Sequence, residues 1–499
     1  MASFLSRPIR PAGRFLYRYP SGFAVLAAAG VAAFALGCGN QYRPVITPIQ
    51  PTGPASQPSG NIIVIAQPDF EPQAPPVTAA CAGGTYATPS IITVVNFSGD
   101  SVEAQANGGN GPLTFSLDSS GSTVFSPDCD GTLIQAPGTS SLLSKSVQSS
   151  TLLPGSQPTN TLVEGGNLYV VEAGLHGPTC MATNCVAQMT GSPQALKQEI
   201  PVAPSLINLT GMITSQRIYA ISQGNSSGAP GQPAWGDCAT PGAVTVNGEA
   251  DAIETTTNTI SARLPLGVCP VYGYMTPDTQ RVFIMNRGSG TVTVVNAQLN
   301  ALDTQFGTHN ATIPVGAGPV FADYYRNGQV LVTANYDGNS ISIIDVSLDV
   351  YGNDSATFGT VLATVPVGLH PVEVSVLQDG SRAYVANQGV IGAGGSVVTP
   401  GSVSIVNLQN YTVEKTISLT TNPHAIASIY NYPIGKVYVA SQNSKYLTVI
   451  RTDSDIVSAT PEMQGNIVDM HVNAQYPGQS ATVSQNSQVE SRSVGSGAP

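Results

Sequence analysis

The octapeptide VPVGLHPV at residues 365–372 decides the fold, because the chain repeats it. Two closely similar stretches are IPVGAGPV at residues 313–320 and LPLGVCPV at residues 264–271, so the interval is about 50 residues. Weaker copies place the second proline of the stretch at Pro112, Pro158, Pro204 and Pro423. A regular interval between such similar stretches indicates a chain built from repeated structural units.

Each proline junction is followed by a short apolar strand, a turn and a second strand of shared pattern. The second strands read RVFIMN at 281–286, VLVTAN at 330–335, RAYVAN at 382–387 and KVYVAS at 436–441. Third strands follow at 291–296, 340–345, 402–407 and 446–450. A fourth strand leads back to the next junction, and Gly, Asn and Asp separate the strands, as is typical of antiparallel β-sheet.

A unit of about 50 residues with four strands predicts the blade of a β-propeller. A single four-stranded sheet cannot bury both of its faces, whereas a ring of such sheets packs face to face. Residues 465–472 read as a first strand that lacks a blade of its own, and we expect them to join the N-terminal strands and close the ring. Candidate second strands begin near residues 61, 122, 167, 217, 281, 330, 382 and 436, which favours eight blades, with seven as the alternative.

The strings YVAN (384–387), VSIVN (403–407) and VPVG (365–368) resemble the YVTN-type β-propeller repeat, a family found in surface proteins of bacteria and archaea. This resemblance implies an all-β fold, with one propeller over residues 61–473. Related propellers include surface-layer proteins, lactonase-like enzymes and quinoprotein dehydrogenase subunits, so the fold alone does not fix the function.

Residues 1–37 are predicted to be a signal peptide. Four arginines precede the apolar stretch 21–36, which is shorter than the roughly 20 residues of a membrane-spanning helix. The stretch ends in ALGC at 35–38, which resembles the lipobox of bacterial lipoproteins, in which the cysteine, here Cys38, carries the lipid. Ala35 stands where Leu is usual, so a plain secretory signal or an uncleaved anchor helix is the alternative. Gly39 in place of Asp implies the outer membrane if the cell has two membranes.

The two ends of the mature chain differ in composition from the repeats. Residues 38–60 are rich in Pro and Gly and predict an extended tether, and residues 474–499 are rich in Ser, Gln and Gly and predict a disordered tail. Only 9% of residues are charged, and loss of the four arginines in residues 1–37 takes the net charge from −11 to −15. So acidic a protein is not expected to bind nucleic acid.

The cysteines fit an exported protein. With Cys38 assigned to lipid, six of the seven remain, which an oxidising compartment can join as three disulfides. The expected pairs are Cys180–Cys185, Cys238–Cys269 and Cys81–Cys129, although other pairings are open. All six fall in or beside loops that emerge on one face of a propeller, where braced loops would form a binding surface, with merely tolerated insertions as the alternative.

The sequence contains no recognisable catalytic motif: no Gly-x-Ser-x-Gly elbow, no His-Glu-x-x-His and no phosphate-binding glycine loop on a helix. The candidate channel residues are Asp323, Glu373, His370 and His424, which could hold a divalent cation, with a water-filled channel as the alternative. No other cofactor is predicted.

We therefore expect a surface-exposed, lipid-anchored binding or scaffold module of the cell envelope. Its partner would be an envelope protein, a glycan or a wall polymer. The alternative is a metal-dependent hydrolase or lactonase-like enzyme with its site at the propeller channel.

Overall fold

The computed structural model describes residues 60–68 and 88–473, apart from short gaps at 119, 144–146, 165, 175, 182–183, 213–214, 225–237, 239–241, 243, 305–310, 326–329, 352, 393–394 and 430–433. These residues belong to one compact unit, Ile46–Pro499. The predicted signal peptide and tail, most of the predicted tether, and both Cys38 and Cys81 lie outside the described residues.

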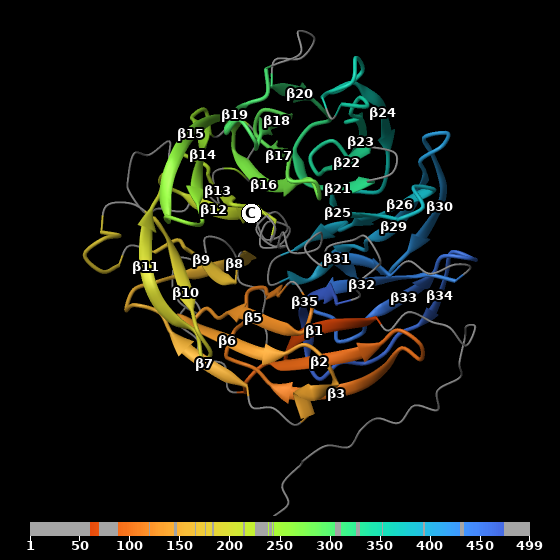
Figure 1. The fold of residues 1–499 in the computed structure, drawn as a ribbon. Helices are drawn as coiled ribbons and strands as arrows, with labels where there is room; N and C mark the ends of the chain where they lie inside the picture. Colours follow the sequence, from red (N-terminus) through yellow and green to blue (C-terminus); the bar gives the residue numbers. More distant parts are fainter. Residues whose placement is uncertain are drawn as a thin grey trace, which may run out of the picture. The chain divides into compact units, whose positions relative to one another are not determined.

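Eight antiparallel four-stranded sheets are arranged in a ring, which confirms the eight-bladed β-propeller (Figure 1). From the inner to the outer strand, blade one consists of β35 (Asn466–Val472), β1 (Asn61–Gln67), β2 (Ile91–Asn96) and β3 (Ser101–Asn107), and blade two of β4 (Ser116–Leu117), β5 (Thr123–Pro127), β6 (Thr132–Pro137) and β7 (Gln148–Thr151). Blade three consists of β8 (Pro158–Glu164), β9 (Asn167–Glu172), β10 (Cys185–Thr190) and β11 (Ala195–Pro201). Blade four consists of β12 (Leu206–Thr210), β13 (Arg217–Ser222), β14 (Asn247–Glu254) and β15 (Thr259–Val268).

The other four blades carry the strongest repeats. Blade five consists of β16 (Pro270–Met275), β17 (Arg281–Asn286), β18 (Thr291–Asn296) and a divided outer strand, β19 (Ala301–Leu302) and β20 (Thr312–Pro314), and blade six consists of β21 (Pro319–Tyr325), β22 (Val330–Asn335), β23 (Ser340–Asp345) and β24 (Val361–Pro366). Blade seven consists of β25 (Pro371–Val376), β26 (Arg382–Asn387), β29 (Ser402–Asn407) and β30 (Thr412–Ser418). Blade eight consists of β31 (Asn422–Ile429), β32 (Lys436–Gln442), β33 (Thr448–Arg451) and β34 (Ile456–Ala459).

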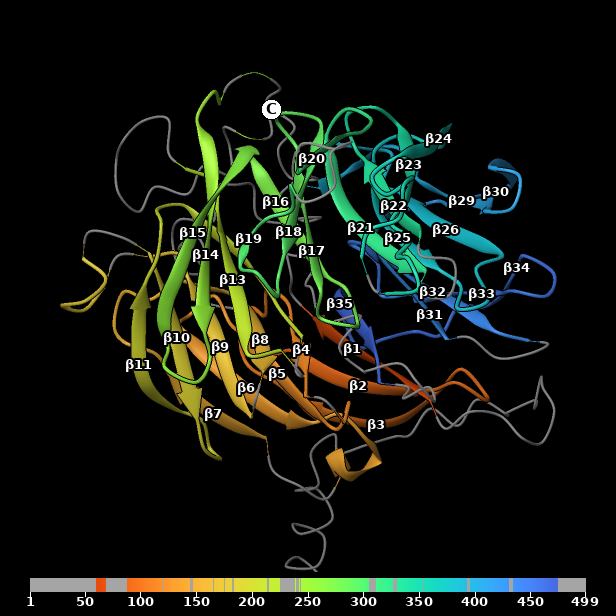
Figure 2. The same ribbon diagram turned by 45° about the horizontal axis from the view of Figure 1, so that its top comes forward.

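The C-terminal strand β35 closes the ring, as the sequence predicted. It pairs with β1 in antiparallel register, with Ile62 opposite Val472 and Val64 opposite Met470 (Figures 1 and 2). Blade one is thus shared by two distant segments of the chain, and each inner strand of the ring has a neighbour on both sides.

The hydrophobic core lies between the blades. One cluster of buried side chains runs from Tyr272 in blade five through Phe321 in blade six to Val374 in blade seven. Because each sheet is packed on both faces, its two inner strands are largely apolar: β16 and β17 are buried along their whole length. The continuous apolar runs in the sequence therefore reflect burial on two faces.

The repeated octapeptide has a steric origin. A Cβ at Gly368 would lie 2.7 Å from the side chain of Asn387, and one at Gly316 would lie 2.4 Å from Asn335, so the junction needs glycine. The amide of Asn387 in turn donates to Ser402 and Ser404 of the third strand, at 3.1 and 2.9 Å. The glycine of the junction and the asparagine that ends the second strand are therefore one packing unit.

Three features depart from the simple repeat. The outer strand of blade five is divided, and both β19 and β20 pair with β18, because residues 303–311 separate them along the chain. Blade seven carries an inserted hairpin of β27 (Val390–Ile391) and β28 (Val397–Thr399), and a single turn of 3-10 helix, η2, spans Ser140–Leu143. Within the described residues, no helix has the length and apolar character needed to cross a membrane.

Candidate functional site

One face of the ring carries the loops between second and third strands and the junctions between blades; we call it the loop face. Two disulfides brace it, Cys180–Cys185 and Cys238–Cys269, and both pairs are among those that the sequence predicted. Cys129, at the end of β5, is also disulfide-bonded, and its predicted partner Cys81 lies outside the described residues.

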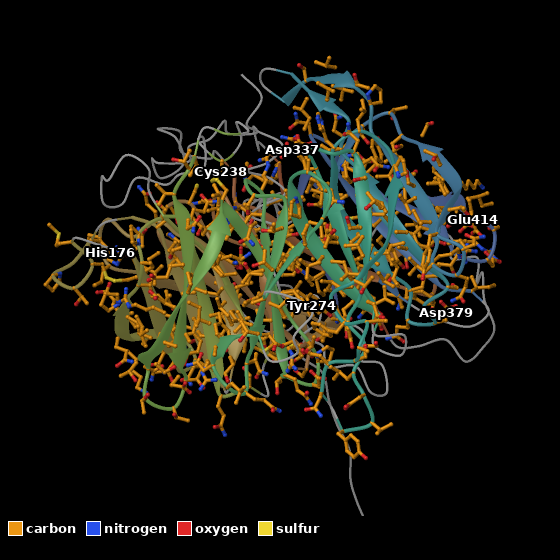
Figure 3. All side chains as sticks on the ribbon, turned by 90° about the horizontal axis from the view of Figure 1, so that it is seen from above. His176, Cys238, Tyr274, Asp337, Asp379 and Glu414 are labelled. Carbon is orange, nitrogen blue, oxygen red and sulfur yellow. A yellow bond between two sulfur atoms is a disulfide. The ribbon has the colours of Figure 1, made fainter. Side chains whose placement is uncertain are left out.

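A small pocket of about 240 Å³ opens beside the second disulfide. Its wall includes both cysteines of that bond, together with Arg287 and Asp337 from the next two blades. The guanidinium group of Arg287 donates two hydrogen bonds to the Asp337 carboxylate, at 2.9 and 3.0 Å. In Figure 3, Cys238 and Asp337 lie along the same edge of the ring.

Three side chains from consecutive blades are stacked at this face. Arg287 lies 5.0 Å above the ring of Tyr336, and the imidazole of His370 stacks on Tyr336 at 4.4 Å, with an angle of 12° between the planes. His370 adopts a left-handed φ of +54°, which costs a non-glycine residue energy, and its Nδ1 is hydrogen-bonded to the carbonyl of Gly389 at 2.7 Å. These contacts hold His370 as a structural part of the loop face.

The loop face also exposes apolar side chains. Val398 is 62% exposed on the inserted hairpin β27–β28, and Tyr446 is 46% exposed in the loop of the neighbouring blade. These two loops are in contact, because Asn443 donates to the carbonyl of Gly395 at 2.8 Å. In the described part of this face, the exposed large apolar side chains are Met181, Val246, Leu369, Val397, Val398 and Tyr446.

The predicted channel carboxylates have structural partners. Asp323 accepts a hydrogen bond from the N–H of Val376, on the next inner strand, at 2.8 Å. Glu373 does the same with the N–H of Ile426 at 2.7 Å. Burial raises the pKa of Asp323 to about 6, although backbone hydrogen bonds from Val376 and Tyr324 oppose the rise. Both carboxylates join adjacent blades.

The structure gives Asp323, Glu373, His370 and His424 separate protein partners, and a cation site formed by these four residues stays a prediction. The histidine side chains are engaged separately, His370 in the stack on the loop face and His424 with the carbonyl of Val468 at 3.1 Å. In the part of the chain that the structure describes, metal-type side chains gather at one place, and it includes none of these four residues.

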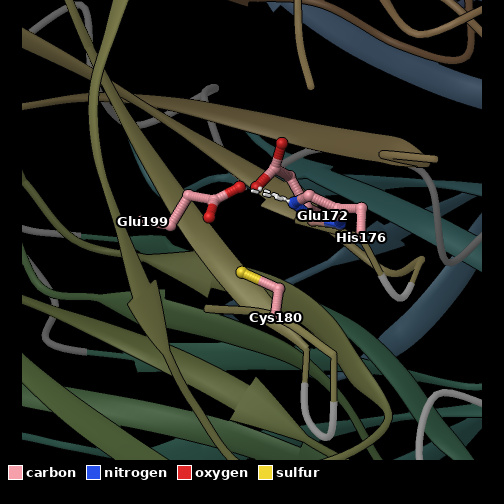
Figure 4. A group of neighbouring side chains, drawn as sticks. All are labelled: Glu172, His176, Cys180 and Glu199. Atoms are coloured by element: carbon pink, nitrogen blue, oxygen red, sulfur yellow. Dashed lines mark hydrogen bonds and ion pairs between the residues drawn. The ribbon is translucent and has the colours of Figure 1, made fainter. Parts of the chain in front are cut away.

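That place is in blade three, where Glu172, His176, Cys180 and Glu199 offer ligand atoms that all lie within 4.8 Å of one another (Figure 4). His176 Nε2 lies 3.1 Å from Glu172 Oε2 and 2.7 Å from Glu199 Oε1. The side chains of Glu172 and His176 are fully buried, and that of Glu199 is 6% exposed. Cys180 is in its disulfide, so its sulfur is not a thiolate.

The electrostatics of this cluster are unusual. Burial lowers the pKa of His176, but the hydrogen bond and charge of Glu172, with further help from Gly174 and Glu199, outweigh it and raise the pKa to about 9. Without another cation, the imidazole is therefore protonated at neutral pH. Sequence reasoning missed this cluster, although one signal was visible: Glu172 ends its second strand where three other blades have asparagine.

The fold and these sites define the class of protein: an eight-bladed β-propeller whose cysteine-braced loops share one face. Residues 274–431, from blade five to the inner strand of blade eight, match the model of the choice-of-anchor I domain. No curated protein matches the chain.

Two solved structures share the fold. AztD from Citrobacter koseri is 12% identical with a TM-score of 0.53, and the match covers 83% of this chain and 98% of that one. The dihydro-heme d1 dehydrogenase NirN, in complex with DHE, is 14% identical with a TM-score of 0.54, and the match covers 87% and 79%. At these identities the likeness concerns the fold alone.

Proposed function

We propose that this protein is an exported, non-catalytic binding module of the cell envelope, that a lipid on Cys38 anchors it, and that its partner docks on the loop face. The observation that carries the proposal is the grouping of exposed apolar side chains, an inserted hairpin and both described disulfides on that one face. Function in rigid repeat scaffolds usually resides on such loops.

Export is supported by three features that point the same way. The disulfides need an oxidising compartment, and the ALGC motif resembles a lipobox. The match of residues 274–431 to the choice-of-anchor I domain fits a protein that is held at a surface. The resemblance to YVTN-type repeats, a family of surface proteins, agrees with this location.

The exposed side chains favour an envelope protein as the partner over a glycan or wall polymer. Among the described residues of the face, five of the six are aliphatic or Met, and the sixth is Tyr446. Aliphatic side chains gain free energy when a protein surface covers them, whereas sugar rings are usually bound against aromatic faces. The alternative, a hydrolase in the channel, finds no ligand set among the described channel residues, since Asp323 and Glu373 bind backbone N–H groups.

Affinity capture from solubilised envelopes tests the proposal. The double variant V397D/V398D places charge on the exposed hairpin and should reduce retention of the partner by about tenfold or more. V350D is the matched control, because Val350 is 93% exposed in a loop on the opposite face. Docking on the loop face would be refuted if both variants lost the partner equally, or if V397D/V398D still captured it. If an oligosaccharide alone eluted the bound material, the face would bind a glycan.

The anchor has its own test. Replacement of Cys38 by Ser should move the protein from the membrane fraction to the soluble fraction, and mass spectrometry of the wild type should find a lipid on Cys38 as the first residue. A mature N-terminus elsewhere would contradict the anchor while leaving the binding face untouched.

A further inference from the structure

Blade three departs from the repeat at the positions that build the Glu–His–Glu cluster. In blades five, six and seven, the second strand ends in an asparagine that donates to hydroxyl groups of the third strand, at 2.9–3.2 Å. Asn387 lies opposite Pro371 on one side and Ser402 on the other, and Glu172 occupies the same place, opposite Pro158 and Cys185. The hydroxyl-bearing residues are replaced by Cys185 and Ala187, so the carboxylate has no hydroxyl donor there.

The imidazole is oriented with one nitrogen toward both carboxylates. His176 Nδ1 lies 2.9 Å from the carbonyl oxygen of Gly174, and because a carbonyl only accepts, Nδ1 carries the hydrogen. Nε2 therefore has a free lone pair in the neutral ring, and it is Nε2 that faces Glu172 and Glu199. A backbone acceptor on the remote nitrogen is the usual support of a metal-binding histidine.

The cluster has an excess of negative charge. Two carboxylates face one imidazole, and in the described part of the chain no Lys or Arg forms an ion pair with either of them. Oε1 of Glu172 is buried and has no hydrogen-bond partner among the described residues. A divalent cation placed among these ligand atoms would face both carboxylates and the imidazole nitrogen at once, which supplies the unpartnered oxygen with a partner.

We propose that Glu172, His176 and Glu199 form a binding site for one divalent transition-metal ion, with Zn²⁺ as the best fit. One imidazole nitrogen and two carboxylate oxygens form a ligand set suited to Zn²⁺, and the nitrogen disfavours Ca²⁺ and Mg²⁺, which prefer oxygen alone. Three protein ligands leave the fourth position of a tetrahedral ion open to water or to a group of a partner.

The fold holds this site in place before any ion binds. A Cβ on Gly174 would lie 2.4 Å from the carbonyl oxygen of Gly155, so the backbone that orients His176 is tightly packed. His176 and Cys180 form a β-bridge, and the Cys180–Cys185 disulfide joins Cys180 to the first residue of β10. Glu199 comes from the outer strand β11 and, as the least buried of the three, marks the side from which an ion enters.

Titration calorimetry of the full-length, oxidised protein tests the site after removal of metal with EDTA. We expect the wild type to bind one equivalent of Zn²⁺, and E199Q and H176N to bind it at least about tenfold more weakly. E249Q is the matched control: Glu249 is a carboxylate of blade four whose side chain is 36% exposed and pairs with Arg263, and this variant should bind zinc as the wild type does. Thermal unfolding without metal checks that each variant is folded.

A crystal structure of the wild type grown with ZnCl₂ tests the zinc site directly, without any variant. An anomalous peak at the zinc edge, about 2.0–2.2 Å from His176 Nε2 and from both carboxylates, would establish the site. Zinc found only at other positions, no saturable binding by the wild type, or E199Q and H176N that bind as tightly as the wild type would overturn the proposal. None of these outcomes bears on the proposed partner-binding face, whose test uses other residues.

Discussion

Glu373, on the inner strand of blade seven, accepts a hydrogen bond of 2.7 Å from the backbone N–H of Ile426, on the inner strand of blade eight. Asp323 does the same between blades six and seven, at 2.8 Å, and Asp469 accepts from Thr114 across the closure between blades one and two. The acids that line the inner strands are therefore connectors between blades. Hydrogen bonds to a buried charged group contribute more to the free energy of unfolding than bonds between neutral groups do, so these contacts should stabilise the fold substantially.

Glu373→Ala should lower the free energy of unfolding by about 2–3 kcal/mol, because it removes the carboxylate that accepts a hydrogen bond from the N–H of Ile426 and leaves this buried N–H without that acceptor. Chemical denaturation followed by circular dichroism measures the change. The control is Glu414→Ala on the exposed outer strand β30, which should change stability by less than about 0.5 kcal/mol. Equal effects of the two substitutions would contradict the connecting role of Glu373.

Glu164 should make stability depend on pH. Burial raises its pKa from 4.5 to about 7, against a lowering hydrogen bond from Thr255, so the folded protein binds this proton more tightly than the unfolded chain. The stabilisation is complete below about pH 4.5 and is lost as the pH rises through 7. Relative to the wild type, Glu164→Gln should gain about 1–2 kcal/mol between pH 5 and pH 8, measured by denaturation at each pH. A constant difference across this range would show that Glu164 does not titrate there.

The two disulfides should differ in their contribution to stability. Cys238 and Cys269 are 31 residues apart and belong to different blades, whereas Cys180 and Cys185 are 5 residues apart. Because the longer loop restricts the unfolded chain more, C238S/C269S should lower the free energy of unfolding by about 4 kcal/mol and C180S/C185S by about 2 kcal/mol. Calorimetry of both variants measures this, and the reverse order would mean that strain or local packing dominates.

Removal of β35 should prevent the ring from closing. A chain that ends at Gly465 lacks the partner of β1 and leaves the buried side chains of Ile62 and Val64 uncovered, so we expect aggregation and no cooperative unfolding. A chain that ends at Asn473 keeps the whole β1–β35 pairing, including the hydrogen bond from the N–H of Asn473 to the carbonyl of Asn61. It should unfold at the same temperature as the full chain. Cooperative unfolding of the shorter chain would show that seven blades suffice.

Much of the fold could be predicted because the same residue types recur at regular intervals along the sequence. The prolines of the octapeptide and the apolar runs in strands such as RAYVAN recur in the strong blades, and the glycine–asparagine pair recurs in three of them. These features indicate four strands per unit without any long-range information. Eight second strands predicted eight blades, and the unpaired segment 465–472 predicted the closure. Two cysteine pairs could be inferred because their loops emerge on one face.

The roles of individual polar side chains could not be predicted in this way. Asp323 and Glu373 were candidates for a channel cation site, with a water-filled channel as the alternative, and the structure shows that each accepts a hydrogen bond from a backbone N–H group of the next inner strand. Glu172 and Glu199 are 27 positions apart in the sequence, and His176 lies in the loop between β9 and β10, where an isolated β-bridge to Cys180 fixes it. Only the register of β9, β10 and β11 brings the two carboxylates to this loop.

The sequence by itself determined the repeat, the all-β architecture and the strand that closes the ring, because these follow from side-chain periodicity along short segments. It favoured eight blades over seven, and the structure settled the number at eight. Only the tertiary structure decided which carboxylates join blades and which meet a histidine. Those contacts depend on side-chain direction across strands and between sheets, and a shift of one residue in register would turn Glu199 away from His176.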